Sequence, residues 1–267
     1  MVTRDFLLTR PVFTSDEFEE FLASRDSLNA KTRDALLRHY VDAGHILRVR
    51  RGVFLTVPPG TAPGSLQVDP YLLAGKMTSD SVLAYHTALE FHGRAYSTYN
   101  NFVFLTTSSR RPSDFRGNHF QGVSFPKPLR EKHTELFGVE TADRSGLDLR
   151  VTSLERTLVD VLDRPSISGG WEEIWRSLES VEYLDLDQVV EYALLLDNST
   201  TTAKVGFYLE HHRDALMVED PYLLQLQQHS PHSPHYMERN ARKSGRLVSR
   251  WNLVVPARVL DRSWEEQ

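Results

Sequence analysis

The sequence predicts a mixed α/β fold of the α+β class, in which a small N-terminal unit precedes a larger unit that combines helices and strands. Three observations carry this prediction. Apolar residues recur at helical spacing near the N-terminus and again in the second half of the chain. Short runs rich in Val, Phe and Leu lie between these stretches. Proline and glycine cluster just before position 65, so we expect units of residues 1–64 and 65–267.

Length and composition restrict the class of protein. The 267 residues are 40% hydrophobic and 25% charged, which is typical of a globular chain. Cysteine is absent, which excludes disulfides, thiolate metal sites and a cysteine nucleophile. The N-terminal MVTRDFLLTRPVF carries charges and a proline where a signal peptide has an apolar core. No apolar run approaches the roughly 18 residues of a membrane span, so we expect a cytoplasmic protein without membrane contact.

The first 44 residues predict two consecutive helices. Thr14 begins Thr-Ser-Asp-Glu, a capping box in which Glu17 reaches back to the start of the first helix. A second helix is predicted from Ala30 to Ala43, because its apolar residues fall on one side of a helical wheel. Gly44 is a natural helix end.

A basic hairpin follows the second helix. Leu47 and Val49 alternate with Arg48 and Arg50, and Arg51 together with the glycine after it supplies the reversal. Two helices and a hairpin in this order predict a winged helix-turn-helix, which can touch DNA with a helix in the major groove and a wing beside the backbone.

The larger unit is predicted to be mixed α and β. Predicted helices cover one or two segments of Asp69–Gly93, a segment opened by a second capping box at Thr152 and Glu155, then Trp171–Val181, Leu186–Leu196 and Thr200–His212. Predicted strands cover Asn101–Thr107, Gly122–Phe125, Leu147–Val151 and Trp251–Val255.

Charge along the chain suggests DNA as a partner. The net charge is -5, yet residues 28–57 hold six basic groups against two acidic ones. The candidate DNA-binding residues are Lys31, Arg33 and Arg38 on the second helix and Arg48, Arg50 and Arg51 on the wing. Guanidinium groups grip phosphate or read guanine, so we assign specificity to the helix and affinity to the wing. The alternative is a solvated helix and hairpin whose charges only maintain solubility.

Other residue patterns give weaker hypotheses about chemistry. His229, His232 and His235 recur in a proline-rich loop without supporting carboxylates, which disfavours a metal site. His86 and His92 lie on a mostly apolar helix and are interpreted as packed or capping groups. The carboxylates of Asp148, Glu155, Asp160 and Asp163 are interpreted as architecture, with Arg156 and Asp160 as a helical pair. Phosphate loops, nucleophile elbows and HExxH are absent, so we expect no enzyme activity, no metal and no cofactor.

Two further basic segments have no assigned role. They are Arg110, Arg111, Arg116, Lys127, Arg130 and Lys132, and a tail containing Arg239, Arg242, Lys243, Arg246 and Arg250. Either segment extends a DNA track, pairs with acidic helices of the same chain, or forms solvated loops, which is the default.

Three segments together resemble the AbiEi family of antitoxins. They are Gly-His-Ile-Leu-Arg-Val-Arg-Arg-Gly-Val-Phe, Ala-Tyr-His-Thr-Ala-Leu-Glu-Phe-His-Gly, and Val-Thr-Ser-Leu-Glu-Arg-Thr-Leu-Val-Asp-Val-Leu-Asp-Arg-Pro with Gly-Gly-Trp-Glu-Glu. The match runs to about Leu209, and Glu-Arg-Thr-Leu-Val-Asp is its most specific part. The resemblance implies an antitoxin of bacterial toxin-antitoxin and abortive-infection (phage-defence) operons. Such a protein is expected to repress its own operon by binding inverted repeats in promoter DNA, where two copies can associate. Its C-terminal unit is expected to counteract an AbiEii-like nucleotidyltransferase toxin.

An acidic block is the candidate toxin-facing surface. Residues 172–220 hold twelve acidic and three basic groups, and Glu172, Glu173 and Glu179 are the candidate contacts for a basic toxin cleft. A solvated helical face is the alternative. Two rival functions also stay open: an enzyme that neutralises the toxin by covalent, kinase-like modification, although the sequence has no kinase motif, and a winged-helix protein-interaction module.

Overall fold

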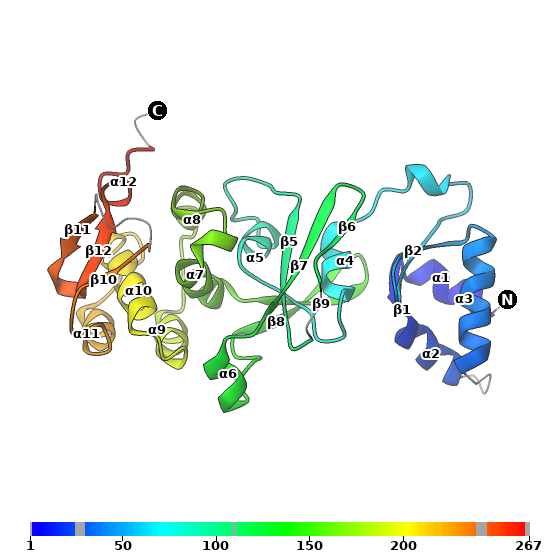
Figure 1. Ribbon diagram of the computed structural model, residues 1–267, viewed down its shortest axis with the longest axis horizontal. Helices are drawn as coiled ribbons and strands as arrows, with labels where there is room; N and C mark the ends of the chain where they lie inside the picture. Colours follow the sequence, from blue (N-terminus) through cyan, green and yellow to red (C-terminus); the bar gives the residue numbers. More distant parts are fainter. Residues whose placement is uncertain (1, 25–29, 109–110, 239–244, 265–267) are drawn as a thin grey trace.

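The protein is elongated, with three parts in a row. The computed structural model describes residues 2–24, 30–108, 111–238 and 245–264. The N-terminal unit lies at one end, a six-stranded sheet in the middle, and helices with a small sheet at the other end (Figure 1). In the described part of the chain, every helix is too short or too polar to cross a lipid bilayer.

The N-terminal unit is a winged helix-turn-helix. Its elements are α1 (Val2–Thr9), β1 (Val12–Thr14), α2 (Ser15–Ala23), α3 (Ala30–Asp42), β2 (Ile46–Arg50) and β3 (Val53–Thr56). The predicted order of two helices and a hairpin is confirmed. The sequence did not predict α1 and β1, because β1 has only three residues and owes its conformation to antiparallel pairing with β3 in a β1-β3-β2 sheet.

Local signals set the ends of these elements. Thr14 Oγ1 accepts from the Glu17 amide at 3.1 Å, and the Thr14 amide donates to Glu17 Oε2 at 2.8 Å, so the predicted capping box is present. Gly44 after α3 and Gly52 in the hairpin turn have φ of +72° and +83°, a region that L side chains rarely adopt. These positions therefore require glycine.

The β1-β3-β2 sheet of the N-terminal unit is buried on both faces. Phe13, Ile46 and Phe54 pack on one face with the helices of the N-terminal unit. Residues Val53 and Leu55 face the other way and pack against α4 of the larger unit. Because alternate residues of a strand point to opposite faces, consecutive buried residues in β3 indicate a strand covered on both sides.

The larger unit contains nine described α-helices and nine described strands, in addition to short 3-10 turns. The helices are α4 (Pro70–Lys76), α5 (His86–Phe91), α6 (Lys127–Lys132), α7 (Leu154–Asp163), α8 (Trp171–Leu178), α9 (Leu186–Leu195), α10 (Ser199–His211), α11 (Asp220–Gln228) and α12 (Ala257–Leu260). The strands are β4 (Val82–Leu83), β5 (Asn101–Thr106), β6 (Ser113–Phe115), β7 (Asn118–Ser124), β8 (Val139–Arg144), β9 (Leu147–Thr152), β10 (His235–Tyr236), β11 (Gly245–Val248) and β12 (Leu253–Pro256).

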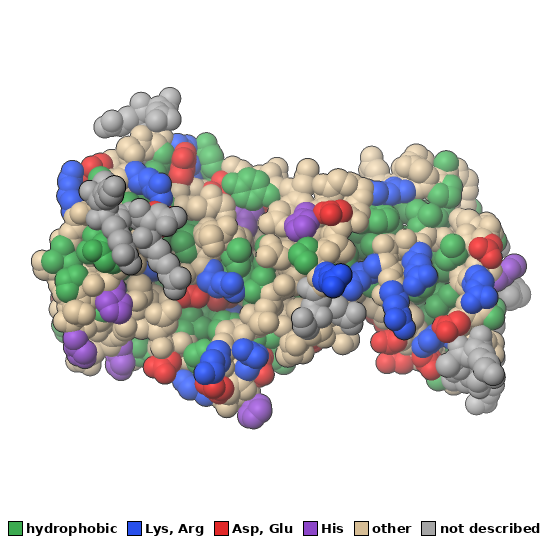
Figure 2. All heavy atoms as spheres, in the orientation of Figure 1, with side chains coloured by type: hydrophobic (Ala, Val, Ile, Leu, Met, Phe, Trp, Pro, Cys, Tyr) green, Lys and Arg blue, Asp and Glu red, His purple; other side chains and the backbone are tan. Residues whose placement is uncertain are grey.

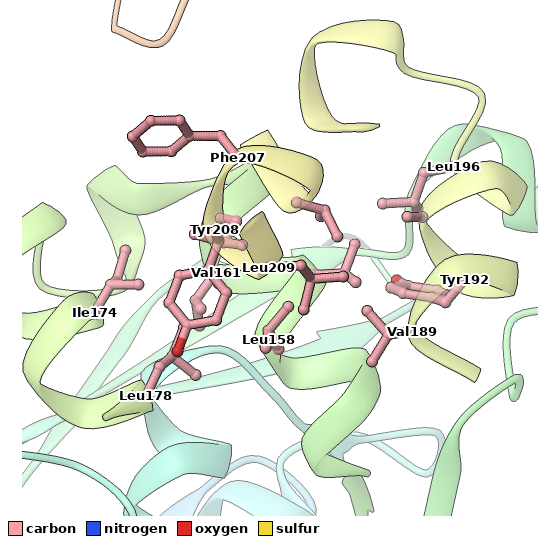
Figure 3. Packing of buried hydrophobic residues seen from close by; sticks show 14 of the residues in the cluster. Leu158, Val161, Ile174, Leu178, Val189, Tyr192, Leu196, Phe207, Tyr208 and Leu209 are labelled. Atoms are coloured by element: carbon pink, nitrogen blue, oxygen red, sulfur yellow. The ribbon is translucent and has the colours of Figure 1, made fainter. Parts of the chain in front are cut away.

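The central sheet is mixed and separates two cores. Its order is β6-β7-β5-β4-β9-β8, with β5 parallel to β7 and β4 parallel to β9. Phe102 and Phe104 face α4, whereas Val103 and Leu105 face the helices on the other side. There α7 packs against α8, α9 and α10, and Leu158, Val161 and Leu209 lie close together between these helices (Figure 3).

Two predictions about the larger unit need correction. The segment Asp69–Gly93 contains two helices, but strand β4 runs between them in the middle of the sheet. The capping box predicted at Thr152 and Glu155 is wrong, since Ser153 caps α7 by accepting from the Arg156 amide. Thr152 belongs to β9, where its hydroxyl bonds with Thr157 at 2.7 Å.

Candidate nucleic-acid interface

A concavity lies between α3 and the β2–β3 hairpin. Its volume is about 350 Å³. It is lined by Ser15, Arg33, Asp34, Leu37, Arg38, Val41, Arg48, Arg51, Gly52 and Phe54. Basic side chains gather over this unit, with acidic ones along its lower edge (Figure 2). Four of the six predicted DNA-binding residues therefore share one hollow formed by two different elements.

The arginines on the two walls are available to an anion. Arg38 on α3 and Arg48 and Arg51 on the hairpin are exposed. Arg48 Nε donates to the Arg50 carbonyl at 3.4 Å, and within the described residues these three arginines form no ion pair with a carboxylate. Because guanidinium groups from two sides converge on one hollow, the arrangement suits a phosphate group.

Arg33 differs from the other arginines of the concavity. Its side chain is only 20% exposed, and it bonds to Glu19 of α2 and, at 2.9 Å, to Asp34. The hydrogen bond with Asp34 contributes most to holding the pKa of Arg33 above its ordinary value. Arg33 therefore connects α2 to α3 before any ligand arrives.

The remaining two predicted residues are not on this surface as described. Lys31 lies in the first turn of α3, but its side chain is outside the described residues. A bulge between Arg48 and Arg50 breaks the strand alternation that placed Arg50 on the outer side of the wing. Arg50 Nη1 instead lies 3.8 Å from Met77 Sδ, at the junction with the larger unit.

The three glutamates predicted to face a toxin are in different environments. Glu172 is exposed and pairs with Arg176 at 3.1 Å, and Glu179 pairs with Arg262 at 3.5 Å. Glu173 is only 5% exposed, so its prediction as a surface contact is wrong. On α8 it points inward, one position from an exposed neighbour, because helical residues turn by about 100° per position.

Glu173 belongs to a buried cluster that sequence reasoning missed. His86 Nε2 lies 2.9 Å from Glu173 Oε1, and His86 Nδ1 lies 3.4 Å from Glu90 Oε1. Burial lowers the pKa of His86, but bonds and charges from both carboxylates outweigh burial and raise it above its ordinary value. Burial likewise raises the pKa of Glu173, but bonds from Ser97 and His86 reverse the direction. His86 is thus a packed group, as predicted, with ionic partners.

Most described side chains of the two further basic segments bind to groups of the same chain. Arg116 bonds to the Pro63 and Leu66 carbonyls of the segment between the two units. The following contacts complete this set: Arg130 with the Phe125 carbonyl, Lys132 with the Leu195 carbonyl, Lys127 with Glu131, Arg246 with Asp261, and Arg250 with Glu210. Arg111 is exposed, while Arg110, Arg239, Arg242 and Lys243 lie outside the described residues.

The carboxylates and histidines considered for catalysis have structural contacts. Asp160 is buried with Arg156 at 3.4 Å and accepts from Tyr192 Oη at 2.7 Å. Burial raises the pKa of Asp160 to about 6 against the opposing charge of Arg156. Nδ1 of His235 bonds with Thr200 at 2.7 Å. Across residues 2–24, 30–108, 111–238 and 245–264, no three such side chains are arranged to hold a metal ion.

Comparison with known proteins concerns the fold. No family model and no curated protein matches this chain. The structure is similar to the crystal structure of the Rv2827c protein from Mycobacterium tuberculosis, with a TM-score of 0.59 over 99% of this chain and 93% of that one. The two sequences are 17% identical. At this identity the similarity shows a shared fold of mixed α and β elements and nothing further.

Proposed function

We propose that this protein binds double-stranded DNA with its winged helix-turn-helix and represses its own operon as an antitoxin of the AbiEi type. The observation that carries the DNA-binding part is the concavity between α3 and the hairpin. Arg38 approaches it from the helix, and Arg48 and Arg51 approach it from the wing. With α3 in the major groove, one DNA strand would pass between helix and wing, and its phosphates would meet these three guanidinium groups.

The three arginines have separate tasks in this proposal. Arg48 and Arg51 contact phosphates and supply affinity for any sequence. Arg38, on the exposed side of α3, contacts a phosphate and also has access to base edges. Operator DNA with inverted repeats would recruit a second copy to the other half-site, since two-fold DNA sites match two-fold protein arrangements.

The test is a titration of the full chain with DNA from upstream of its own gene, at several salt concentrations. We expect the logarithm of the affinity to fall linearly with the logarithm of salt. Changing Arg38, Arg48 and Arg51 together to Ala should reduce that slope by about 3, because each lost phosphate contact removes about 0.9. Lys127→Ala is the control, since this exposed cation lies on α6, away from the winged helix (Figure 1).

The antitoxin part of the proposal depends on the sequence resemblance and on exposed glutamate side chains. Glu172 and Glu179 sit on α8 or at its end and are open to solvent. A nucleotidyltransferase handles anionic substrates and needs a basic cleft, so an acidic surface is complementary to it. In cells whose growth is inhibited by an AbiEii-like nucleotidyltransferase, co-expression of this protein should restore growth.

Two other outcomes would favour a different class of function. Phosphoryl or nucleotidyl transfer to the purified toxin in the presence of ATP and metal would indicate an enzyme. Failure to bind any duplex, combined with capture of the toxin by the N-terminal unit, would indicate an interaction module. Unchanged DNA affinity in the triple arginine variant would reject the proposed surface.

A further inference from the structure

A second cavity lies on the larger unit, far from the winged helix in the sequence. Its volume is about 420 Å³. It is lined by His86, Tyr99, Asn100, Asn101, Ser166, Ile167 and Gly169. These residues come from α5, the start of β5 and the turn before α8, so the cavity is a product of tertiary packing.

The wall behind this cavity carries excess negative charge. The His86 side chain is 2% exposed and lies between the carboxylates of Glu90 and Glu173, which are 2% and 5% exposed. Two carboxylates face one imidazole, so the buried site keeps a negative charge even when the imidazole is protonated. Such a site attracts cations and disfavours anions, because water screens little of the charge.

Two acceptors in this region have spare capacity. Glu173 Oε1 accepts from His86, from the Ser97 amide at 2.8 Å and from Ser177 Oγ at 3.1 Å. Glu173 Oε2 accepts from the Tyr99 hydroxyl at the long distance of 3.4 Å. Among the described residues, Asn101 Oδ1 is buried without any hydrogen-bond partner. Unused acceptors indicate a ligand that donates hydrogen bonds.

The approach from the cavity to Glu173 depends on a glycine. Gly169 has φ of +87°, and a Cβ there would lie 2.6 Å from Glu173 Cγ and 3.1 Å from Tyr99 Cε2. The absent side chain lets the Gly169 backbone pack directly on the Glu173 side chain and the Tyr99 ring, so Glu173 lies immediately behind the cavity wall. The Tyr99 ring lies 4.3 Å from the His86 ring and supplies a flat surface at the cavity wall.

We propose that this cavity binds a guanidinium group, from a small molecule or from an arginine side chain of a partner protein. A guanidinium is planar and cationic, carries five donors and no acceptor, and stacks on aromatic rings. Its charge would balance the excess at His86, Glu90 and Glu173. Its donors would reach the Asn101 amide oxygen and Glu173 Oε2, while its plane rests on Tyr99.

The test uses NMR of the full-length protein with three probes. They are agmatine as a free guanidinium, N-acetyl-L-argininamide as a protein-like arginine, and N-acetyl-L-citrullinamide as the uncharged analogue. We expect both guanidinium probes to shift the His86 ring nitrogens and the Asn101 amide with a Kd on the order of 1 mM, and the citrulline probe to give no shift. Tenfold tighter agmatine binding would identify a free small molecule, and equal or tighter binding of the capped arginine would identify a protein side chain.

Matched variants test the charge. Glu173→Gln keeps the shape and removes one charge, so binding should weaken at least tenfold, whereas Glu172→Gln changes an exposed neighbour and should leave binding unchanged. Asn101→Ala removes the unpaired acceptor without altering the ionic cluster, and it should also weaken binding. This variant provides the test if Glu173→Gln does not fold. Absence of shifts up to about 10 mM, equal binding of citrulline, or equal effects of the two glutamate variants would overturn the proposal.

Discussion

Lys76 of α4 donates to Glu17 Oε1 of the winged helix at 2.5 Å. The other carboxylate oxygen of Glu17 accepts from the Thr14 amide and completes the capping box of α2. One side chain therefore starts a helix in the first unit and attaches that unit to the second. Because Val53 and Leu55 also pack against α4, the winged helix-turn-helix has a fixed position on the larger unit.

Removing either partner of this pair should have unequal effects. Lys76→Ala loses a partly buried ion pair, and we expect a loss of about 1 kcal/mol in the free energy of unfolding. Glu17→Ala loses the ion pair and the cap, so about 2 kcal/mol is expected. Urea denaturation of both single variants and the double variant gives the coupling energy, and strictly additive losses would show that the two residues do not interact.

Arg38 and Arg33 should differ in their effect on DNA binding. Arg38→Ala is expected to reduce the slope of log affinity against log salt concentration by about 1. It should also relax the sequence preference at one base pair, because the side chain is exposed beside the concavity. Arg33→Ala removes ion pairs with Glu19 and Asp34, so we expect it mainly to lower stability by about 1 kcal/mol. Binding isotherms and thermal melts of each variant separate the two effects. A larger binding defect for Arg33→Ala would mean that Arg33 leaves its partners to contact DNA.

Charge reversal of the glutamates on α8 and at its end should have effects that depend on whether the side chain is exposed or buried. Glu172→Lys and Glu179→Lys are exposed changes that should keep the fold and, in the proposed antitoxin function, abolish rescue of growth while promoter binding persists. Glu173→Lys would bury an ammonium next to His86 and should destabilise the protein by about 4 kcal/mol. Growth assays and circular dichroism are the measurements. Full rescue by the Glu172/Glu179 double variant would exclude this surface as the toxin contact.

The His86 cluster should make stability depend on pH in both directions. The pKa of His86 is raised in the folded protein, so its contribution is complete below the ordinary imidazole value of about 6.5 and is lost as pH rises through the folded value. The pKa of Glu173 is lowered, so its contribution is present above about 4.5 and is lost as pH falls through the folded value. The free energy of unfolding, measured from pH 3 to 9, should therefore decline at both ends.

A variant identifies the residue responsible for the alkaline decline. His86→Gln keeps a hydrogen-bonding side chain but cannot carry a proton, so the decline between neutral and alkaline pH should become shallower by up to about 1.4 kcal/mol per pH unit. His119→Gln provides a control, since the His119 side chain is 42% exposed beside Asp114. An identical pH profile for wild type and His86→Gln would contradict the assignment.

Local parts of the fold were predictable because their causes lie within a few residues. The capping box of Thr14 and Glu17, the end of α3 at Gly44 and the hairpin turn at Gly52 depend on hydrogen bonds and φ angles of near neighbours. The long helices of the larger unit and strands β5, β7, β9 and β12 overlap the predicted ranges for the same reason. Their periodic apolar patterns are continuous in the sequence.

Short elements and residue environments were not predictable in the same way. Strand β4 has only two residues, and its neighbours in the sheet, β5 and β9, supply the hydrogen bonds that define it. The cap at Ser153 instead of Thr152 depends on where β9 stops pairing. The inward turn of Arg50 depends on a bulge and on Met77 of the other unit.

The amino-acid order by itself determined the mixed α/β class, the winged helix-turn-helix and the arginines of its helix and wing. Only the tertiary structure decided which charges face solvent. Glu172 and Glu173 are adjacent and identical in type, yet one is exposed and the other pairs with His86, 87 positions earlier in the chain. The reason is physical: a buried carboxylate is tolerated only where distant segments bring it donors and a cation, and no local pattern encodes that meeting.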